Sequence, residues 1–106
     1  MVRVIQEKGA ELAGLCARYG VRRLEVFGSA ATGEGFDPQA SDLDFLVEFQ
    51  RTDAMNVADQ YFGLWEDLMA LFGRDVDLVM GRAMRNPHFI EAVNRTRSLV
   101  YAAEVA

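Results

Sequence analysis

The sequence predicts an α+β domain in which a small mixed sheet of three or more strands is flanked by helices. Three observations support this prediction. Two long segments have the 3.6-residue apolar period of amphipathic helices, and three short apolar segments have the composition of strands. The third observation is continuity, since no repeat, linker or low-complexity run divides the 106 residues. Because domains of about 100–150 residues are the commonest, we expect residues 1–106 to form a single domain.

The elements are expected in the order helix, strand, loop, strand, helix, strand, helix. The first helix spans residues 3–19 and ends at Gly20, because glycine adopts the left-handed conformation that closes a helix at little cost. A short strand at residues 24–27 ends at Gly28-Ser29. Residues 30–40 are small, polar and rich in glycine, which predicts a loop with room for one helical turn at its start.

A second long helix is expected to begin after Asp53 or Asn56, which are both suitable N-cap residues, and to reach about Phe72. Gly73 closes this helix. Its buried face is an apolar stripe at helical spacing, made of Val57, Tyr61, Leu64, Trp65, Leu68, Leu71 and Phe72.

The clearest strand covers residues 43–49, in which alternate side chains are apolar and share one face. They are Leu43, Phe45, Val47 and Phe49. A third strand is expected at residues 75–80. A last short helix opens at Asn86-Pro87, since proline is favourable at the first helical position. Residues 98–101 fit either a strand or a helix.

Composition excludes several classes of function. With 11 basic and 16 acidic residues the chain carries a formal charge of −5, which repels nucleic-acid backbones, so direct nucleic-acid binding is not expected. Its apolar runs are far shorter than the ~20 residues of a membrane helix, and no basic-then-apolar leader opens it. We therefore expect a cytoplasmic protein with no membrane partner. One cysteine, Cys16, and one histidine, His88, exclude an internal disulfide and zinc sites built from pairs of these residues.

Gly28 and Ser29 are the first candidate site residues, because they lie where the first strand ends. A glycine lets the backbone approach a ligand closely, and N–H groups at a helix start favour phosphate. The Ser29 hydroxyl adds one more donor. By itself this dipeptide is weak evidence, because Gly-Ser pairs are common in turns.

Asp42 and Asp44 form the second feature, since residues two apart on a strand point to the same face. Two carboxylates this close repel each other unless a cation lies between them. Mg²⁺ prefers such hard oxygen ligands. A solvated strand edge is the alternative interpretation, but the strand continues directly into the apolar run 45–47, which makes it less favoured.

Asp77 is the third feature, an acid inside the apolar segment 76–79. Burial of a carboxylate without a partner is unfavourable, so this residue points to a site. Asp75 is on the same face and could take the same role. We favour Asp77 because apolar residues flank it on both sides, whereas Asp75 follows Gly73-Arg74 at the start of the strand.

Together these features are more specific than any one alone, and the sequence resembles the DNA polymerase β-like nucleotidyltransferase superfamily. Within it, the closest resemblance is to the minimal nucleotidyltransferase (MNT) proteins. Residues 26–33 resemble the family's phosphate-gripping segment, residues 41–47 its metal-binding strand, and residues 76–79 its third-carboxylate strand. Residues 86–101 are similar to the way such chains end. The resemblance covers nearly the whole chain and implies the nucleotidyltransferase fold.

The resemblance also implies a Mg²⁺-dependent transfer of a nucleotidyl group to a hydroxyl acceptor, with ATP as the expected donor and AMP as the group transferred. Asp42 and Asp44 would ligate two Mg²⁺ ions. Asp77 would ligate the ion on the acceptor side and help to take the proton. Gly28 and Ser29 would hold the β- and γ-phosphates.

The family also suggests the partners of the chain. MNT proteins lack the domain by which larger relatives select a substrate, so a second protein is expected to supply the acceptor. In the family this is a small helical HEPN toxin, often a ribonuclease, which the MNT protein neutralises as an antitoxin by adding AMP to a tyrosine. The expected partners are thus a nucleoside triphosphate and a HEPN-type toxin, and the sequence leaves self-association open.

Two departures from the family pattern favour a second hypothesis, an antitoxin that binds and occludes its partner with weak or no catalysis. The loop before Asp42 is longer than is typical, with Gly35-Phe36 as the candidate extra pair. Ala30 and Thr32 stand where the family often has arginine. The three aspartates oppose this hypothesis. A transferase for small molecules such as aminoglycosides is disfavoured, because the sequence shows no substrate-binding domain.

Overall fold

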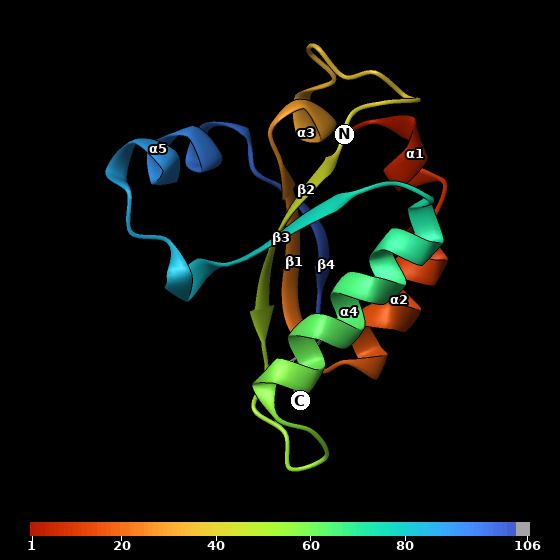
Figure 1. Cartoon of the computed structure of the whole chain (residues 1–106), viewed down its shortest axis with the longest axis vertical. Helices are drawn as coiled ribbons and strands as arrows, with labels where there is room; N and C mark the ends of the chain where they lie inside the picture. Colours follow the sequence, from red (N-terminus) through yellow and green to blue (C-terminus); the bar gives the residue numbers. More distant parts are fainter. Residues whose placement is uncertain (104–106) are drawn as a thin grey trace.

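The computed structural model describes residues 1–103 and contains a four-stranded mixed sheet with helices on both sides (Figure 1). The strands lie in the order β3-β2-β1-β4. β1 pairs antiparallel with both β2 and β4, whereas β2 pairs parallel with β3. Their bounds are β1 Val21–Phe27, β2 Leu43–Phe49, β3 Val76–Met80 and β4 Ser98–Ala102. This arrangement confirms the predicted α+β class with a small mixed sheet.

Two longer helices, α2 and α4, lie side by side along one side of the sheet, and α5 lies on the other (Figure 1). The remaining helical segments are short. The bounds are α1 Arg3–Gln6, α2 Gly9–Arg18, α3 Ser29–Thr32, α4 Val57–Phe72, the 3₁₀ turn η1 Gly81–Ala83 and α5 Pro87–Thr96. Because α2 and α4 lie on one side of the sheet and α5 on the other, the two faces of β2 meet different helices.

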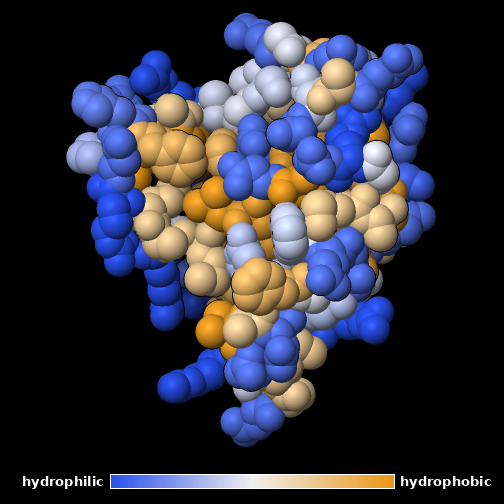
Figure 2. Space-filling view, viewed as in Figure 1, coloured by the Kyte–Doolittle hydropathy of each residue, from blue (hydrophilic) through white to orange (hydrophobic). Residues whose placement is uncertain are grey.

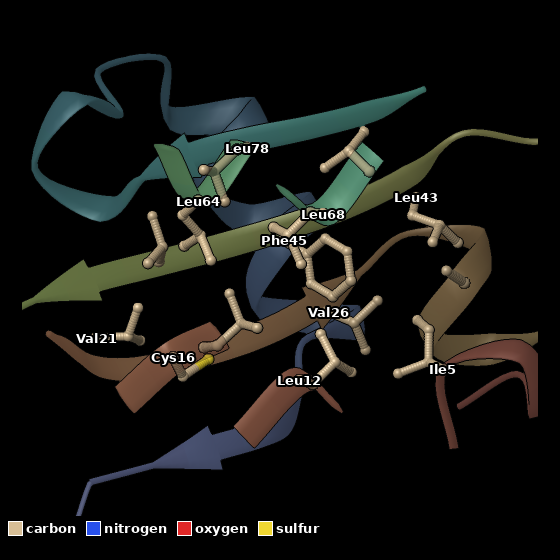
Figure 3. Packing of buried hydrophobic residues seen from close by; sticks show 14 of the residues in the cluster. Ile5, Leu12, Cys16, Val21, Val26, Leu43, Phe45, Leu64, Leu68 and Leu78 are labelled. Atoms are coloured by element: carbon tan, nitrogen blue, oxygen red, sulfur yellow. The ribbon is translucent and has the colours of Figure 1, made fainter. Parts of the chain in front are cut away.

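The main core lies between the sheet and the pair α2 and α4 (Figure 3). Strand alternation turns Leu43, Phe45 and Val47 into it, and all three side chains are buried, as the sequence predicts. From the helices, Leu64 and Leu68 of α4 pack against this face. The opposite face carries a smaller apolar cluster of Phe27, Leu46 and Val93, with Val79 and Met84 packed against it. The second cluster fixes α5 onto the face that also presents Asp44.

β3 is an edge strand, so backbone groups on its outer side have no neighbouring strand to pair with. Trp65 Nε1 donates a hydrogen bond to the Val76 carbonyl at 2.8 Å, and the Tyr61 hydroxyl donates to the Leu78 carbonyl at 2.6 Å. The donors are one helical turn apart on α4 and the acceptors are two residues apart on β3. One face of α4 therefore covers the open edge and fixes the residue between the two acceptors, Asp77.

Two predicted elements need correction, one at an internal break and one at its start. The single helix expected over residues 3–19 is wrong, because the chain leaves helical geometry at Lys8 (φ −105°, ψ 18°) and begins again at Gly9, a poor helix former. The first turn packs separately, with the Val2 amide donating to the Ala30 carbonyl at 2.9 Å. The first strand begins at Val21 rather than at residue 24, since pairing with β2 reaches Phe49.

The second long helix agrees with the prediction except at its first residue. The Asn56 side chain accepts from the Asp59 amide at 2.8 Å, and Gly73 closes the helix with φ 63°. Val57, expected on the buried stripe, is the first residue of α4 and is 54% exposed. The ambiguous segment 98–101 is strand, since it pairs with β1.

Surface polarity in this view is mixed, with apolar side chains gathered near the centre and hydrophilic ones towards the margins (Figure 2). Four large hydrophobic side chains in the described residues are exposed: Val57, Phe62, Phe89 and Leu99. Within residues 1–103, the structure contains no helix with the length and apolar character that a membrane span requires.

Gly63 and Gly14 give matched alanine variants in two helices. A Cβ at Gly63 would lie 3.0 Å from Cζ of Tyr19 and nearer still to Cε1, whereas a Cβ at Gly14 would meet nothing within 4 Å. The Tyr19 ring cannot swing away freely, because its hydroxyl donates to Asp67 Oδ2 at 2.5 Å. We expect Gly63→Ala to lower the free energy of unfolding by about 1–3 kcal/mol. Gly14→Ala should raise it by about 0.5–1 kcal/mol, since alanine is the better helix former.

Urea denaturation followed by far-ultraviolet circular dichroism measures both changes. Equal effects of the two substitutions would contradict the tight packing of Gly63 on Tyr19.

Candidate functional site

Strand register brings the predicted site residues together. Asp44 of β2 is the pairing partner of Phe27 in β1 on one side and of Asp77 in β3 on the other. Directly paired residues on neighbouring strands project to the same face of a sheet. Asp44 and Asp77 therefore lie side by side. Gly28 directly follows Phe27, the partner of Asp44 in β1, so the turn begins next to Asp44.

The turn at Gly28 is in close contact with Asp44. Gly28 has φ 70°, in the region that favours glycine. A Cβ at this position would lie 2.8 Å from Oδ2 of Asp44, so any larger residue would displace the carboxylate. The turn and the aspartates are thus neighbours, as the sequence-based hypothesis requires.

Ser29 is the first residue of α3, which is the single helical turn that the sequence left room for at the start of the loop. Its backbone geometry is set by bonds from the Ala31 and Thr32 amides to the Gly28 carbonyl, at 3.0 and 3.3 Å. Ala30 and Ala31 are buried and fill the space beneath the turn. Alanine at position 30 is therefore part of the main core in this chain, where the family often has a cation.

Electrostatic repulsion connects the three aspartates. Burial, then the charge of Asp77 and then that of Asp42, together raise the pKa of Asp44 to about 6. Asp42 and Asp77 themselves are exposed. Asp75, the alternative to Asp77, lies just before β3, where its carbonyl accepts from the Leu43 amide at 3.2 Å, and it does not contribute to the shift at Asp44. The geometry favours Asp77 over Asp75 as the companion of Asp44.

The donor chemistry of this group fits a divalent cation. Carboxylate oxygens are the ligands that Mg²⁺ prefers, and a cation between Asp44 and Asp77 would relieve the repulsion that raises the pKa of Asp44. Over residues 1–103, however, no three or more His, Cys, Asp or Glu side chains are already gathered closely enough to hold a metal ion. The aspartates are neighbours without forming a closed coordination shell.

Thr96 is a site residue that sequence reasoning missed. The Gly28 amide donates to Thr96 Oγ1 at 2.9 Å, so the last residue of α5 holds the turn. The next residue, Arg97, donates from Nε and Nη2 to the buried carboxylate of Glu25 in β1, at 2.8 and 2.6 Å. These bonds hold the pKa of Glu25 below its usual value, chiefly through Arg97. No local pattern could reveal Thr96, because 68 residues separate it from Gly28.

Comparison with known proteins supports the resemblance predicted from the sequence. Residues 11–105 match the family described as Polymerase beta, Nucleotidyltransferase. A protein of Methanocaldococcus jannaschii, named as a candidate protein adenylyltransferase, is 34% identical over 84 residues, which cover 79% of each chain. Protein adenylyltransferase MntA of Thermococcus cleftensis is 39% identical over 69 residues, 65% of each chain.

Solved structures agree with these matches. The structure of a candidate minimal nucleotidyltransferase superposes with a TM-score of 0.67 at 34% identity, covering 88% of this chain and 89% of that one. A Shewanella oneidensis complex of a tri-AMPylated HEPN toxin with its MNT antitoxin superposes with a TM-score of 0.62 over 93% of this chain and 73% of that one. Its identity is 18%, so this second likeness shows the fold alone. The predicted resemblance and fold are confirmed.

The raised pKa of Asp44 predicts a dependence of stability on pH. Because the folded-state pKa is about 6, above the usual 3.8, folding favours the protonated carboxyl. This contribution to stability is fully present below the usual pKa and is lost as pH rises through about 6. At neutral pH, without metal, Asp44→Asn should therefore raise the free energy of unfolding by about 1–2 kcal/mol, after discounting for solvent screening of a half-exposed group.

Urea denaturation at a series of pH values tests this, with Asp75→Asn as the control. The difference in the free energy of unfolding between Asp44→Asn and the wild type should grow from acid to neutral pH, whereas Asp75→Asn should show no such growth. A less stable Asp44→Asn protein at neutral pH would instead identify Asp44 as a structural hydrogen-bond acceptor.

Proposed function

Because the chain belongs to the polymerase beta nucleotidyltransferase family, we propose that it transfers AMP from ATP to a hydroxyl group of a HEPN-type toxin, and so acts as an antitoxin. One observation carries this proposal: Asp44 and Asp77 are paired across β2 and β3, next to the turn at Gly28. The adenylyltransferase names of the relatives support the reaction, and the HEPN toxin in the Shewanella oneidensis complex supports the partner.

Asp42, Asp44 and Asp77 are the residues that would hold two Mg²⁺ ions. When bound, such ions polarise the phosphates and stabilise the charge on the attacking and leaving oxygens. Without a cation, the three carboxylates repel a triphosphate, so metal and nucleotide are expected to bind together. Asp77, which is exposed, would accept the proton of the acceptor hydroxyl.

Ser29 would bind the β- and γ-phosphates through its hydroxyl and amide. The Gly28 amide is already bonded to Thr96, so the role of Gly28 is to bring the backbone close to the aspartates rather than to donate. Without arginine at positions 30 and 32, the phosphates are held mainly by Ser29 and by the cations. We therefore expect weaker nucleotide binding than in family members that have those arginines.

Occlusion of the toxin without chemistry is the second candidate function. Two observations favour it: the aspartates do not form a closed metal site among residues 1–103, and alanine and threonine occupy positions 30 and 32. The two functions differ in what they require. AMP transfer needs the three carboxylates, whereas occlusion needs only the surface that binds the toxin.

Mass spectrometry of the toxin tests the transfer. The chain is incubated with Mg²⁺, ATP and the HEPN-type protein encoded beside its gene, and the toxin is examined for added AMP. Asp44→Asn and Asp77→Asn should lower the rate by about 100-fold or more, because each removes an expected metal ligand. Asp75→Asn, also an exposed acid at this end of the sheet, should leave the rate unchanged.

Absence of AMP from the toxin with wild type, or equal modification by Asp44→Asn, would reject the transferase. Full neutralisation of the toxin by the double variant Asp42→Asn/Asp44→Asn would favour occlusion.

A further inference from the structure

Residues 33–41 form the loop between α3 and β2, and Asp42 follows directly. This loop is the one that is longer than is typical of the family pattern described above. It has some internal order, since the Ala40 and Ser41 amides both donate to the Asp37 carbonyl, at 3.2 and 3.0 Å. The Asp37 amide donates in return to Ser41 Oγ at 2.9 Å. These bonds shape the end of the loop but do not attach it to the sheet.

Arg74, just before β3, makes that attachment. Its Nη1 donates to the Ser41 carbonyl at 3.0 Å, and its Nη2 donates to the Pro38 carbonyl. The guanidinium carbon lies 5.6 Å from the centre of the Phe36 ring, in cation–π geometry. Three points of the loop, at residues 36, 38 and 41, thus contact one side chain.

The guanidinium group suits this arrangement because it is planar and carries several donors in a rigid fork. Its Nε is buried and has no hydrogen-bond partner among the residues that the structure describes. Both terminal nitrogens donate to carbonyls of the loop. The guanidinium group of Arg74 therefore faces the loop. Arg74 is therefore not arranged to bind a phosphate.

We infer that Arg74 is a positioning residue that holds the loop so that Asp42 enters the site beside Asp44. The inference rests on the proposed function, because it concerns how one of the three aspartates is presented. Arg74 acts through Ser41, the residue before Asp42, and touches none of the reacting groups. Two residues after Arg74, the Val76 position pairs with Leu43, so the same short stretch fixes both sides of Asp42.

Phe36 explains the added length of the loop. Gly35-Phe36 is the candidate extra pair, and the Phe36 ring packs both against the main core and against Arg74. The longer loop therefore carries its own anchor. Removing the ring should therefore weaken the hold of Arg74 on the loop.

Hydrogen exchange of the free chain tests the inference without any catalysis. In Arg74→Met, the Ala40 and Ser41 amides should exchange about ten-fold faster or more, because the loop loses two bonds to the sheet. Amides of β2 and α4 should keep their wild-type rates. Arg18→Met is the matched control, since Arg18 also lies 5.6 Å from an aromatic ring, that of Tyr19, and should leave the loop unchanged.

Two results would overturn the inference: unchanged exchange at Ala40 and Ser41 in Arg74→Met, or faster exchange spread equally over the whole sheet. The second result would mean that Arg74 supports the fold in general rather than the loop.

The transfer assay supplies the second readout. Arg74→Met should lower kcat by about ten-fold or more while the KM for ATP changes little, because Ser29 and the phosphates are not displaced. Arg74→Lys, which keeps one donor, should recover part of kcat. An unchanged kcat in an active protein would overturn the inference. If the wild type does not transfer AMP at all, the proposed function fails, and the exchange experiment still decides the role of Arg74.

Discussion

The parallel pairing of β2 with β3 is the constraint on which the rest of this structure depends. In this register two carboxylates, Asp44 and Asp77, stand opposite each other, which is an unfavourable arrangement in the absence of a cation. Parallel strands cannot be joined by a tight turn, so the long connection through α4 is required. That same helix then stabilises β3 through Trp65 and Tyr61. The element that makes the pairing possible also holds it in place.

The two faces of β2 have different roles because successive side chains of a strand point to opposite faces. Odd-numbered residues from Leu43 to Val47 are buried against α2 and α4, and the even-numbered residues face α5. Leu46 is covered by Val93 of α5, whereas Asp44, two residues earlier, remains half-buried. Partial burial of this kind keeps Asp44 reachable while strengthening its interaction with neighbouring charges.

Local signals in the sequence were sufficient to predict most elements, and they also supplied the candidate site residues. The alternation in residues 43–49, the Asn56 cap and the Gly73 stop each depend on neighbours in sequence, and the structure has them as predicted. The break at Lys8 and the exposure of Val57 depend on what each segment packs against, which periodicity does not reveal. Likewise Thr96 and Arg74 act on residues far along the chain, and neither belongs to a motif.

The bond from the Gly28 amide to Thr96 has a consequence for biosynthesis. The turn precedes its partner in α5 by 68 residues, and β4, which pairs with β1, follows α5. A nascent chain on the ribosome can assemble β1, β2 and their helices long before these contacts are available. The turn at Gly28 can therefore gain this bond only after residue 96 has been synthesised, so a product truncated before that residue would carry Asp42, Asp44 and Asp77 without it.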